Sequence, residues 1–121
     1  MYTITVRSRF SSAHNLRGYK GKCEELHGHN WTVEMSASSD KLDELGMVAD
    51  FKDLKAVLEG IILELDHKYI NDVGYFKQVN PTSENISKFI YDNAKGKLSG
   101  VRIEKVTVWE TEGSCATYSE S

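Results

Sequence analysis

The spacing of apolar residues changes twice along this chain of 121 residues, and this change constrains the fold more than any other feature. The segments from Tyr2 to about Ala13 and from His29 to about Ser38 are rich in β-branched and aromatic residues that partly alternate with polar ones, which predicts two strands. From Asp50 to Leu65, apolar residues recur at steps of three and four, which predicts a helix with one buried stripe.

A second helix is predicted to begin near the sequence PTSEN, where Thr82 can cap the first turn, and to end around Gly96. Residues from Val101 to Trp109 alternate again, and those from Cys115 to Tyr118 form a short strand-like segment. The resulting order of elements, ββααββ, predicts an α+β fold in a single domain spanning residues 1–121. We expect a four-stranded antiparallel sheet with two helices on one face.

The charge balance indicates which partners to expect. With 15 Lys and Arg against 18 Asp and Glu, the chain has a net charge of -3, so no global positive field favours nucleic acid or an anionic membrane. No apolar run reaches the roughly 18 residues of a membrane span, and MYTITVRSRF lacks the layout of a secretion signal. We therefore expect a cytoplasmic protein whose Cys23 and Cys115 are free thiols.

The stretch CEELHGHN contains two histidines, His27 and His29, at a spacing that places both side chains on one face of a strand. His14 ends the first predicted strand, which a hairpin would bring alongside. Three neutral imidazoles are a ligand set suited to Zn²⁺ with one position open to water or substrate, so the spacing predicts a catalytic zinc site. The alternative is that His27 and His29 are surface residues on a strand edge.

Cys23 precedes the two histidines and has two possible roles. As a fourth ligand it would close the site and make the zinc structural. As a thiolate beside the metal it would act as a base or nucleophile, with a pKa lowered by the adjacent positive charge. The spacing alone does not choose between these roles.

Three further groups are candidates for chemistry. The pair Asp66 and His67 follows the first predicted helix, and a carboxylate beside a histidine suits general acid and base catalysis; the alternative is a pair of ordinary helix-end residues. Glu110 ends the third predicted strand, where its carboxylate could accept two parallel hydrogen bonds from the edge of a guanine or pterin ring; the alternative is an exposed acid. Cys115 is expected to pack as a small buried residue.

Taken together, the motifs FSSAHNL, CEELHGHNW, GMVADFKDLK, LDHKYIND, NPTSENIS and VWET resemble those of the 6-pyruvoyl tetrahydropterin synthase and 6-carboxytetrahydropterin synthase family of tunnelling-fold proteins. They follow the family's order from about residue 10 to residue 111. The resemblance implies that Zn²⁺ is bound by three histidines, that three residues are catalytic and that one carboxylate anchors the pterin. The ligands are then His14, His27 and His29, the catalytic residues Cys23, Asp66 and His67, and the anchor Glu110.

The spacing CxxxHGH is similar to that of the bacterial 6-carboxytetrahydropterin synthases of queuosine biosynthesis, whereas animal-type pyruvoyl synthases place the cysteine further ahead. This resemblance implies a zinc-dependent lyase that converts 7,8-dihydroneopterin triphosphate to 6-carboxytetrahydropterin, with release of triphosphate and acetaldehyde. It also implies a homohexamer with active sites at subunit interfaces. The alternatives are a pyruvoyl synthase that stops after triphosphate elimination and a non-enzymatic, zinc-stabilised pterin-binding module.

A triphosphate substrate needs local positive charge in an acidic protein. Arg17, Lys20 and Lys22 lie in the predicted loop that leads to Cys23, and they are predicted to contact the phosphates. The alternative is that they belong to a solvated loop.

Overall fold

The computed structural model describes residues 1–20 and 24–120. Their elements follow the predicted order ββααββ, which confirms the α+β class, and two short 3₁₀ helices stand between the α-helices. The elements are β1 (Tyr2–His14), β2 (His27–Ser39), α1 (Phe51–Ile62), η1 (Ile70–Asp72), η2 (Gly74–Lys77), α2 (Ser83–Ala94), β3 (Arg102–Thr111) and β4 (Ser114–Ser119).

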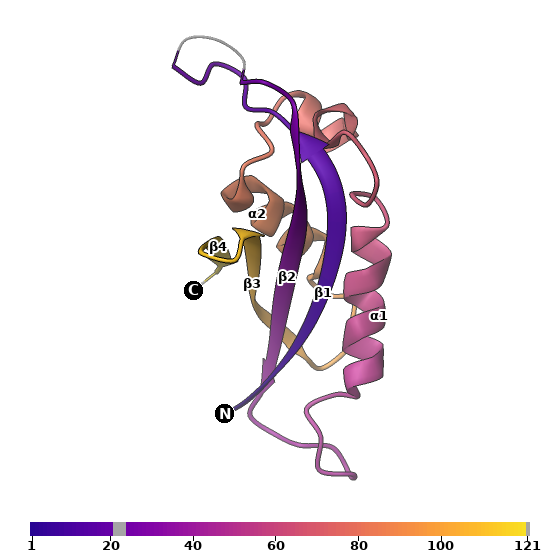
Figure 1. The fold of residues 1–121 in the computed structure, drawn as a ribbon. Coiled ribbons are helices and arrows are strands. Elements are labelled where there is room, and N and C mark those ends of the chain that lie inside the picture. The colour runs from indigo at the N-terminus through magenta and orange to yellow at the C-terminus, as the bar shows by residue number, and fades with distance from the viewer. Residues whose placement is uncertain (21–23, 121) are drawn as a thin grey trace.

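The four strands form one antiparallel sheet in the order β1-β2-β3-β4. Figure 1 shows the long β1 and β2 strands side by side, with α1 next to β1 and α2 behind the sheet. Helix α1 packs on β1 and helix α2 packs on β3 and β4, so both helices cover one face of the sheet, as predicted. The register of the β1–β2 pair places His14 directly opposite His27, at the end of the two strands next to the loop that connects them.

The core lies between the sheet and the helices. Strand β2 contributes alternate residues that are fully buried, and α1 and α2 contribute the apolar stripes that the periodicity predicts. The largest of these side chains are Trp31, Met35, Leu54, Leu58, Ile86 and Ile90. In the part of the chain that the structure describes, no helix covers the opposite face of the sheet, and outward positions there are polar, as in the pairs Arg7–Glu34 and Thr107–Thr117.

Cys115 lies on this helix-free face, so the prediction of a buried thiol is wrong. Its side chain is exposed because it pairs with Trp109 across β3 and the edge strand β4, where no helix covers the sheet. The structure therefore leaves an accessible thiol at this position.

Helix α1 ends at Ile62, three residues before the end of the predicted stripe. Leu65 is nevertheless fully buried, because it lies in the turn that follows and its carbonyl accepts a hydrogen bond from the Ser12 hydroxyl. At the other end of the stripe, Phe51 is exposed, and the Asp50 carboxylate caps the helix by accepting from the Lys52 amide. The hydrogen bond between Ser12 and Leu65 therefore holds the turn after α1 against β1, an edge strand of the sheet.

The amino terminus of α2 offers a stability prediction. The Thr82 hydroxyl accepts a hydrogen bond from the Asn85 amide at 3.1 Å, as expected of an N-cap. We expect Thr82→Ala to lower the free energy of unfolding by about 1 kcal/mol, measured by urea denaturation, because that amide loses its partner. Ser83→Ala, in the same helical turn, is the control and should change the value by less than about 0.5 kcal/mol. Equal losses in the two variants would contradict the capping role.

Within the described residues, no helix combines the length and apolar character needed to cross a membrane.

Candidate metal centre

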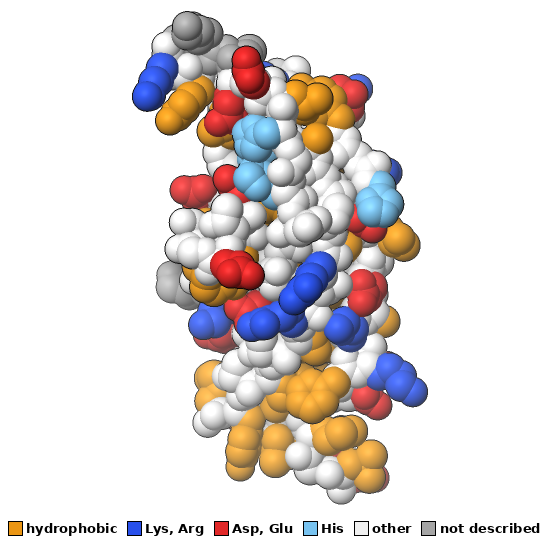
Figure 2. Space-filling view, in the orientation of Figure 1, with side chains coloured by type: hydrophobic (Ala, Val, Ile, Leu, Met, Phe, Trp, Pro, Cys, Tyr) orange, Lys and Arg blue, Asp and Glu red, His pale blue; other side chains and the backbone are white. Residues whose placement is uncertain are grey.

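The three predicted ligands come together at the end of the β1–β2 hairpin where the loop of residues 15–26 joins the two strands. His14 ends β1 opposite His27, and His29 stands two residues further along β2 on the same face as His27. The centroids of the three imidazole rings lie 4.6–5.3 Å apart. Figure 2 shows histidine side chains gathered toward this end of the molecule.

The carboxylate of Glu110 joins the three histidines. Its two oxygens lie 3.3 Å from His29 Nε2 and 4.0 Å from His14 Nε2. The potential ligand atoms of all four residues lie within 4.8 Å of one another. Glu110 stands where β3 shifts its pairing with β4, between Trp109 and Thr111. From the sequence we expect a pterin contact for Glu110, and its place beside the histidines is an addition made by the structure.

Backbone carbonyls determine the tautomers of two histidines. His14 Nδ1 lies 2.8 Å from the Pro81 carbonyl oxygen, and His27 Nδ1 lies 2.9 Å from the Glu25 carbonyl oxygen. A carbonyl oxygen only accepts hydrogen bonds, so both Nδ1 atoms carry a proton, and the Nε2 atom of each ring is the one available to a metal. These two Nε2 atoms face each other at 3.1 Å, an arrangement that a shared cation stabilises.

The third histidine supplies independent evidence that a metal fits this site. Among the described residues, His29 Nε2 is buried and has no hydrogen-bond partner. Leaving such an atom unpaired costs about 1–3 kcal/mol, and coordination of a cation would remove that cost. Burial lowers the pKa of His14, so this ring is uncharged at neutral pH. Three imidazole nitrogens and a carboxylate are a donor set that suits Zn²⁺.

The Trp31 side chain packs against two of the three histidines. It is fully buried, and its ring meets the rings of His14 and His29 edge to face, with centroids 4.9 and 5.3 Å away. Its indole Nε1 donates a hydrogen bond to the Ser12 carbonyl at 3.3 Å, which fixes the ring against β1. Sequence reasoning did not assign Trp31 to the site. Trp31 stands two residues after His29 on the same face of the strand, and this spacing could have predicted that the two side chains are neighbours.

Asp66 and His67 lie in the turn after α1 and are not part of the histidine group. The Ser11 amide donates to the Asp66 carboxylate at 2.9 Å, and the His67 amide donates to the Ser11 carbonyl at 2.7 Å. The two side chains lie 3.4 Å apart, between Asp66 Oδ1 and His67 Nδ1. His67 has a left-handed backbone with φ of 55° and a side chain that is 80% exposed. The turn therefore holds the imidazole out in solvent at a conformational cost.

The loop between β1 and β2 contains Cys23, predicted to be catalytic, and the three residues predicted to contact phosphates. Cys23 and Lys22 lie outside the described residues. Lys20 is exposed, with its ammonium 5.5 Å from the centre of the Tyr19 ring. The Arg17 guanidinium is occupied by backbone carbonyls, including that of Phe76 at 2.6 Å, so the structure does not support a phosphate contact for Arg17.

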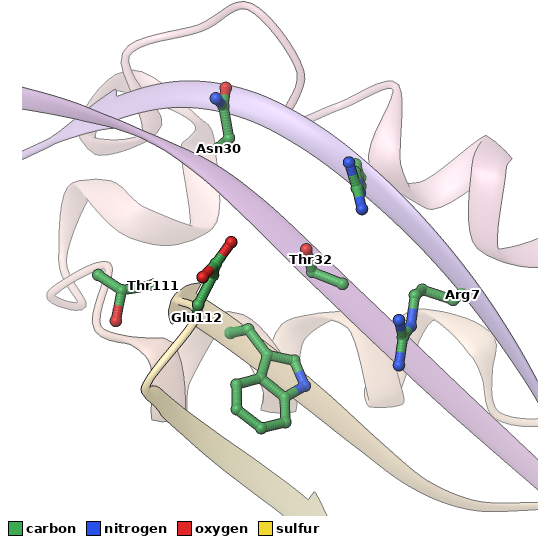
Figure 3. A pocket seen from close by; sticks show the side chains of 7 residues that line it. Arg7, Asn30, Thr32, Thr111 and Glu112 are labelled. Atoms are coloured by element: carbon green, nitrogen blue, oxygen red, sulfur yellow. The ribbon is translucent and has the colours of Figure 1, made fainter.

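A large hollow lies elsewhere, on the helix-free face of the sheet. It measures about 610 Å³, and Figure 3 shows the side chains around it. Its lining residues are Arg7, Arg9, Asn30, Thr32, Trp109, Thr111 and Glu112. A smaller hollow borders His29 and shares Asn30 with the larger one. The donor atoms that suit a metal therefore do not line the hollow of about 610 Å³.

Known proteins resemble this chain over almost its whole length. The family model described as 6-pyruvoyl tetrahydropterin synthase matches residues 3–121. A 6-carboxy-5,6,7,8-tetrahydropterin synthase of Synechocystis sp. is 40% identical and aligns over 98% of this chain and 93% of its own. A 6-pyruvoyl tetrahydrobiopterin synthase of Homo sapiens is 37% identical over 95% of this chain and 89% of its own.

The fold agrees as well. The solved structure of Caenorhabditis elegans 6-pyruvoyl tetrahydropterin synthase superposes with a TM-score of 0.84 and 27% identity, covering 99% of this chain and 96% of that one. This likeness confirms the predicted tunnelling fold, and the curated relatives confirm the resemblance seen in the motifs. The chain belongs to the 6-pyruvoyl tetrahydropterin synthase family.

Proposed function

We propose that this protein is a zinc-dependent 6-carboxy-5,6,7,8-tetrahydropterin synthase of queuosine biosynthesis. Its reaction consumes one water, converts 7,8-dihydroneopterin triphosphate to 6-carboxytetrahydropterin and releases triphosphate and acetaldehyde. The observation that carries the proposal is the convergence of two fixed imidazole Nε2 atoms and the unpaired Nε2 of His29 on one point. The spacing CxxxHGH and the 6-carboxy relative at 40% identity favour the 6-carboxy product.

The residues of the metal centre divide into ligands and a substrate anchor. His14, His27 and His29 hold the metal, and when bound it supplies a Lewis acid that makes the side-chain hydroxyls of the substrate more acidic. Glu110 accepts hydrogen bonds from the amidine-like edge of the pterin, which orients the ring so that its side chain lies toward the histidines. Its position beside His29 is consistent with an anchor close to the metal.

Proton transfer is assigned to Cys23 and to the Asp66–His67 pair. The Asp66 carboxylate contacts one nitrogen of His67, which leaves the other nitrogen available to take or give a proton. His67 is exposed and lies outside the metal-binding group of its own chain. We therefore assign it to the site of a neighbouring subunit in a homohexamer.

Incubation of the zinc-loaded protein with 7,8-dihydroneopterin triphosphate tests the function directly. We expect acetaldehyde and 6-carboxytetrahydropterin among the products. Triphosphate release with a retained pyruvoyl side chain would instead identify a 6-pyruvoyl tetrahydropterin synthase, the second candidate, which the name of the matched family favours. Absence of turnover together with a Cys-His₃ zinc sphere in the spectrum of the pterin complex would identify a binding module.

Cys23→Ala separates a catalytic thiol from a fourth ligand. We expect this variant to keep its zinc and to lose about a hundredfold in turnover, because water replaces the thiolate poorly as a base. Cys115→Ala is the matched control, since that thiol is exposed on β4 and should be dispensable. Zinc content and product formation are measured on the same samples. Parallel loss of zinc and activity in Cys23→Ala would show that the thiol is a ligand.

A further inference from the structure

The carbonyl of Pro81 determines which nitrogen of His14 faces the metal. Pro81 is the only proline of the chain, it is buried, and its carbonyl accepts the hydrogen bond from His14 Nδ1 at 2.8 Å. If this carbonyl turned away, the His14 proton could move to Nε2 and occupy the lone pair that faces His27. The groups that hold the peptide around Pro81 therefore act on the metal site.

The side chain of Asn80 holds this peptide from one side. Its Oδ1 accepts a hydrogen bond from the Arg17 amide at 2.9 Å, and its Nδ2 donates to the Arg17 carbonyl at 2.9 Å. A single amide group thus pairs with both polar groups of one residue, as a neighbouring strand would. The Asn80 carbonyl is held in turn by the Thr82 amide and by Asn85 Nδ2, each at 2.9 Å.

The side chain of Arg17 holds the same segment from the other side. Its guanidinium donates to three backbone carbonyls, at 2.6 Å from Phe76, 3.2 Å from Asn71 and 3.4 Å from Val79. Because a guanidinium has five donors and no acceptor, it can gather carbonyls that the 3₁₀ helices leave unpaired. Arg17 follows His14 by only three residues, so this interlock connects the two partners of the His14–Pro81 hydrogen bond.

We propose that Asn80 and Arg17 are positioning residues of the metal site, which act by holding the Pro81 carbonyl against His14 Nδ1. This inference rests on the metal binding of the proposed function. It also gives Arg17 a role other than the phosphate contact predicted from the sequence. Loss of an outer-shell partner of a ligand costs about 10–100-fold in metal affinity. Asn80 acts one hydrogen bond further from the metal, so the lower end of that range, about tenfold, applies.

The test measures the dissociation constant for Zn²⁺ by competition with a fluorescent chelator, together with urea unfolding of each protein. We expect Asn80→Ala to weaken Zn²⁺ binding about tenfold. Asn85→Ala removes only one of the two hydrogen bonds to the Asn80 carbonyl, so we expect it to weaken Zn²⁺ binding about threefold. The matched control is Asn93→Ala, because Asn93 is also half-buried and also donates to a backbone carbonyl, that of Phe89 at 2.8 Å within α2.

Two results would overturn the inference. One is Zn²⁺ binding within twofold of the unaltered protein in both Asn80→Ala and Asn85→Ala. The other is an equal loss of affinity in Asn93→Ala, which would attribute the effect to general destabilisation. If Asn80→Ala does not fold, Asn85→Ala decides alone. Failure of the unaltered protein to bind Zn²⁺ is a separate outcome, and it would overturn the proposed function along with this inference.

Discussion

Replacing His29 with alanine is expected to weaken zinc binding by about two to three orders of magnitude and to lower turnover with it. The free energy of zinc binding is about 10–16 kcal/mol for a site with four ligands, so each ligand contributes about a quarter of it. Loss of one ligand therefore weakens binding by about two to three orders of magnitude. His29 is the best position for this test because its Nε2 has no hydrogen-bond partner among the described residues. Its removal therefore breaks no hydrogen bond of that atom, and the fold should persist.

Zinc per chain and chelator competition check this result, with circular dichroism as the control for folding. A His29→Ala protein that keeps one zinc per chain with unchanged affinity would remove His29 from the ligand set. The remaining cluster of His14, His27 and Glu110 could then still bind the metal, and Glu110 would be the ligand to test next.

The second large effect is expected from His67→Asn, which should lose about a thousandfold in turnover while keeping its zinc. An imidazole is the group best matched to proton transfer near neutral pH, and the other three histidines of the chain lie in the metal group. Asparagine is the suitable replacement because the backbone of His67 is left-handed, a conformation that asparagine adopts more readily than alanine. Zinc content is measured beside turnover. Loss of zinc, or turnover within threefold of normal, would contradict the assignment.

The same two variants test whether the active site is shared between subunits. If the protein forms the proposed homohexamer, co-expression of His29→Ala and His67→Asn chains would give mixed oligomers in which about a quarter of the sites combine intact zinc ligands from one chain with an intact His67 from another. We expect about a quarter of normal activity if sites are shared in this way. Mixed oligomers without activity would show that both parts of a site come from one chain.

Most of the fold was predictable because period and spacing are local properties. The switch from alternation to a three- and four-residue repeat at Asp50 marks the start of α1, and Thr82 marks the start of α2. The proximity of His27 and His29 follows from strand geometry alone. Their approach to His14 required only that the first two strands form a hairpin.

The rest depends on contacts between distant parts of the chain. The place of Glu110 beside His29 depends on the register of β3 against β2 and on the irregularity after Trp109, and neither is encoded in a local pattern. The left-handed backbone of His67 arises from the way its turn bonds to Ser11. The engagement of Arg17 by carbonyls depends on two 3₁₀ helices that the apolar pattern did not predict.

The pairing of His14 with His27 across β1 and β2 has a consequence for quality control during folding. A hairpin that formed one residue out of step would turn every β2 side chain to the wrong face, and the three imidazoles would no longer meet. Such a chain could collapse and still retain most of its secondary structure, yet it could not take up zinc. If the protein binds zinc as proposed, only molecules with the correct strand register would bind the metal and become active.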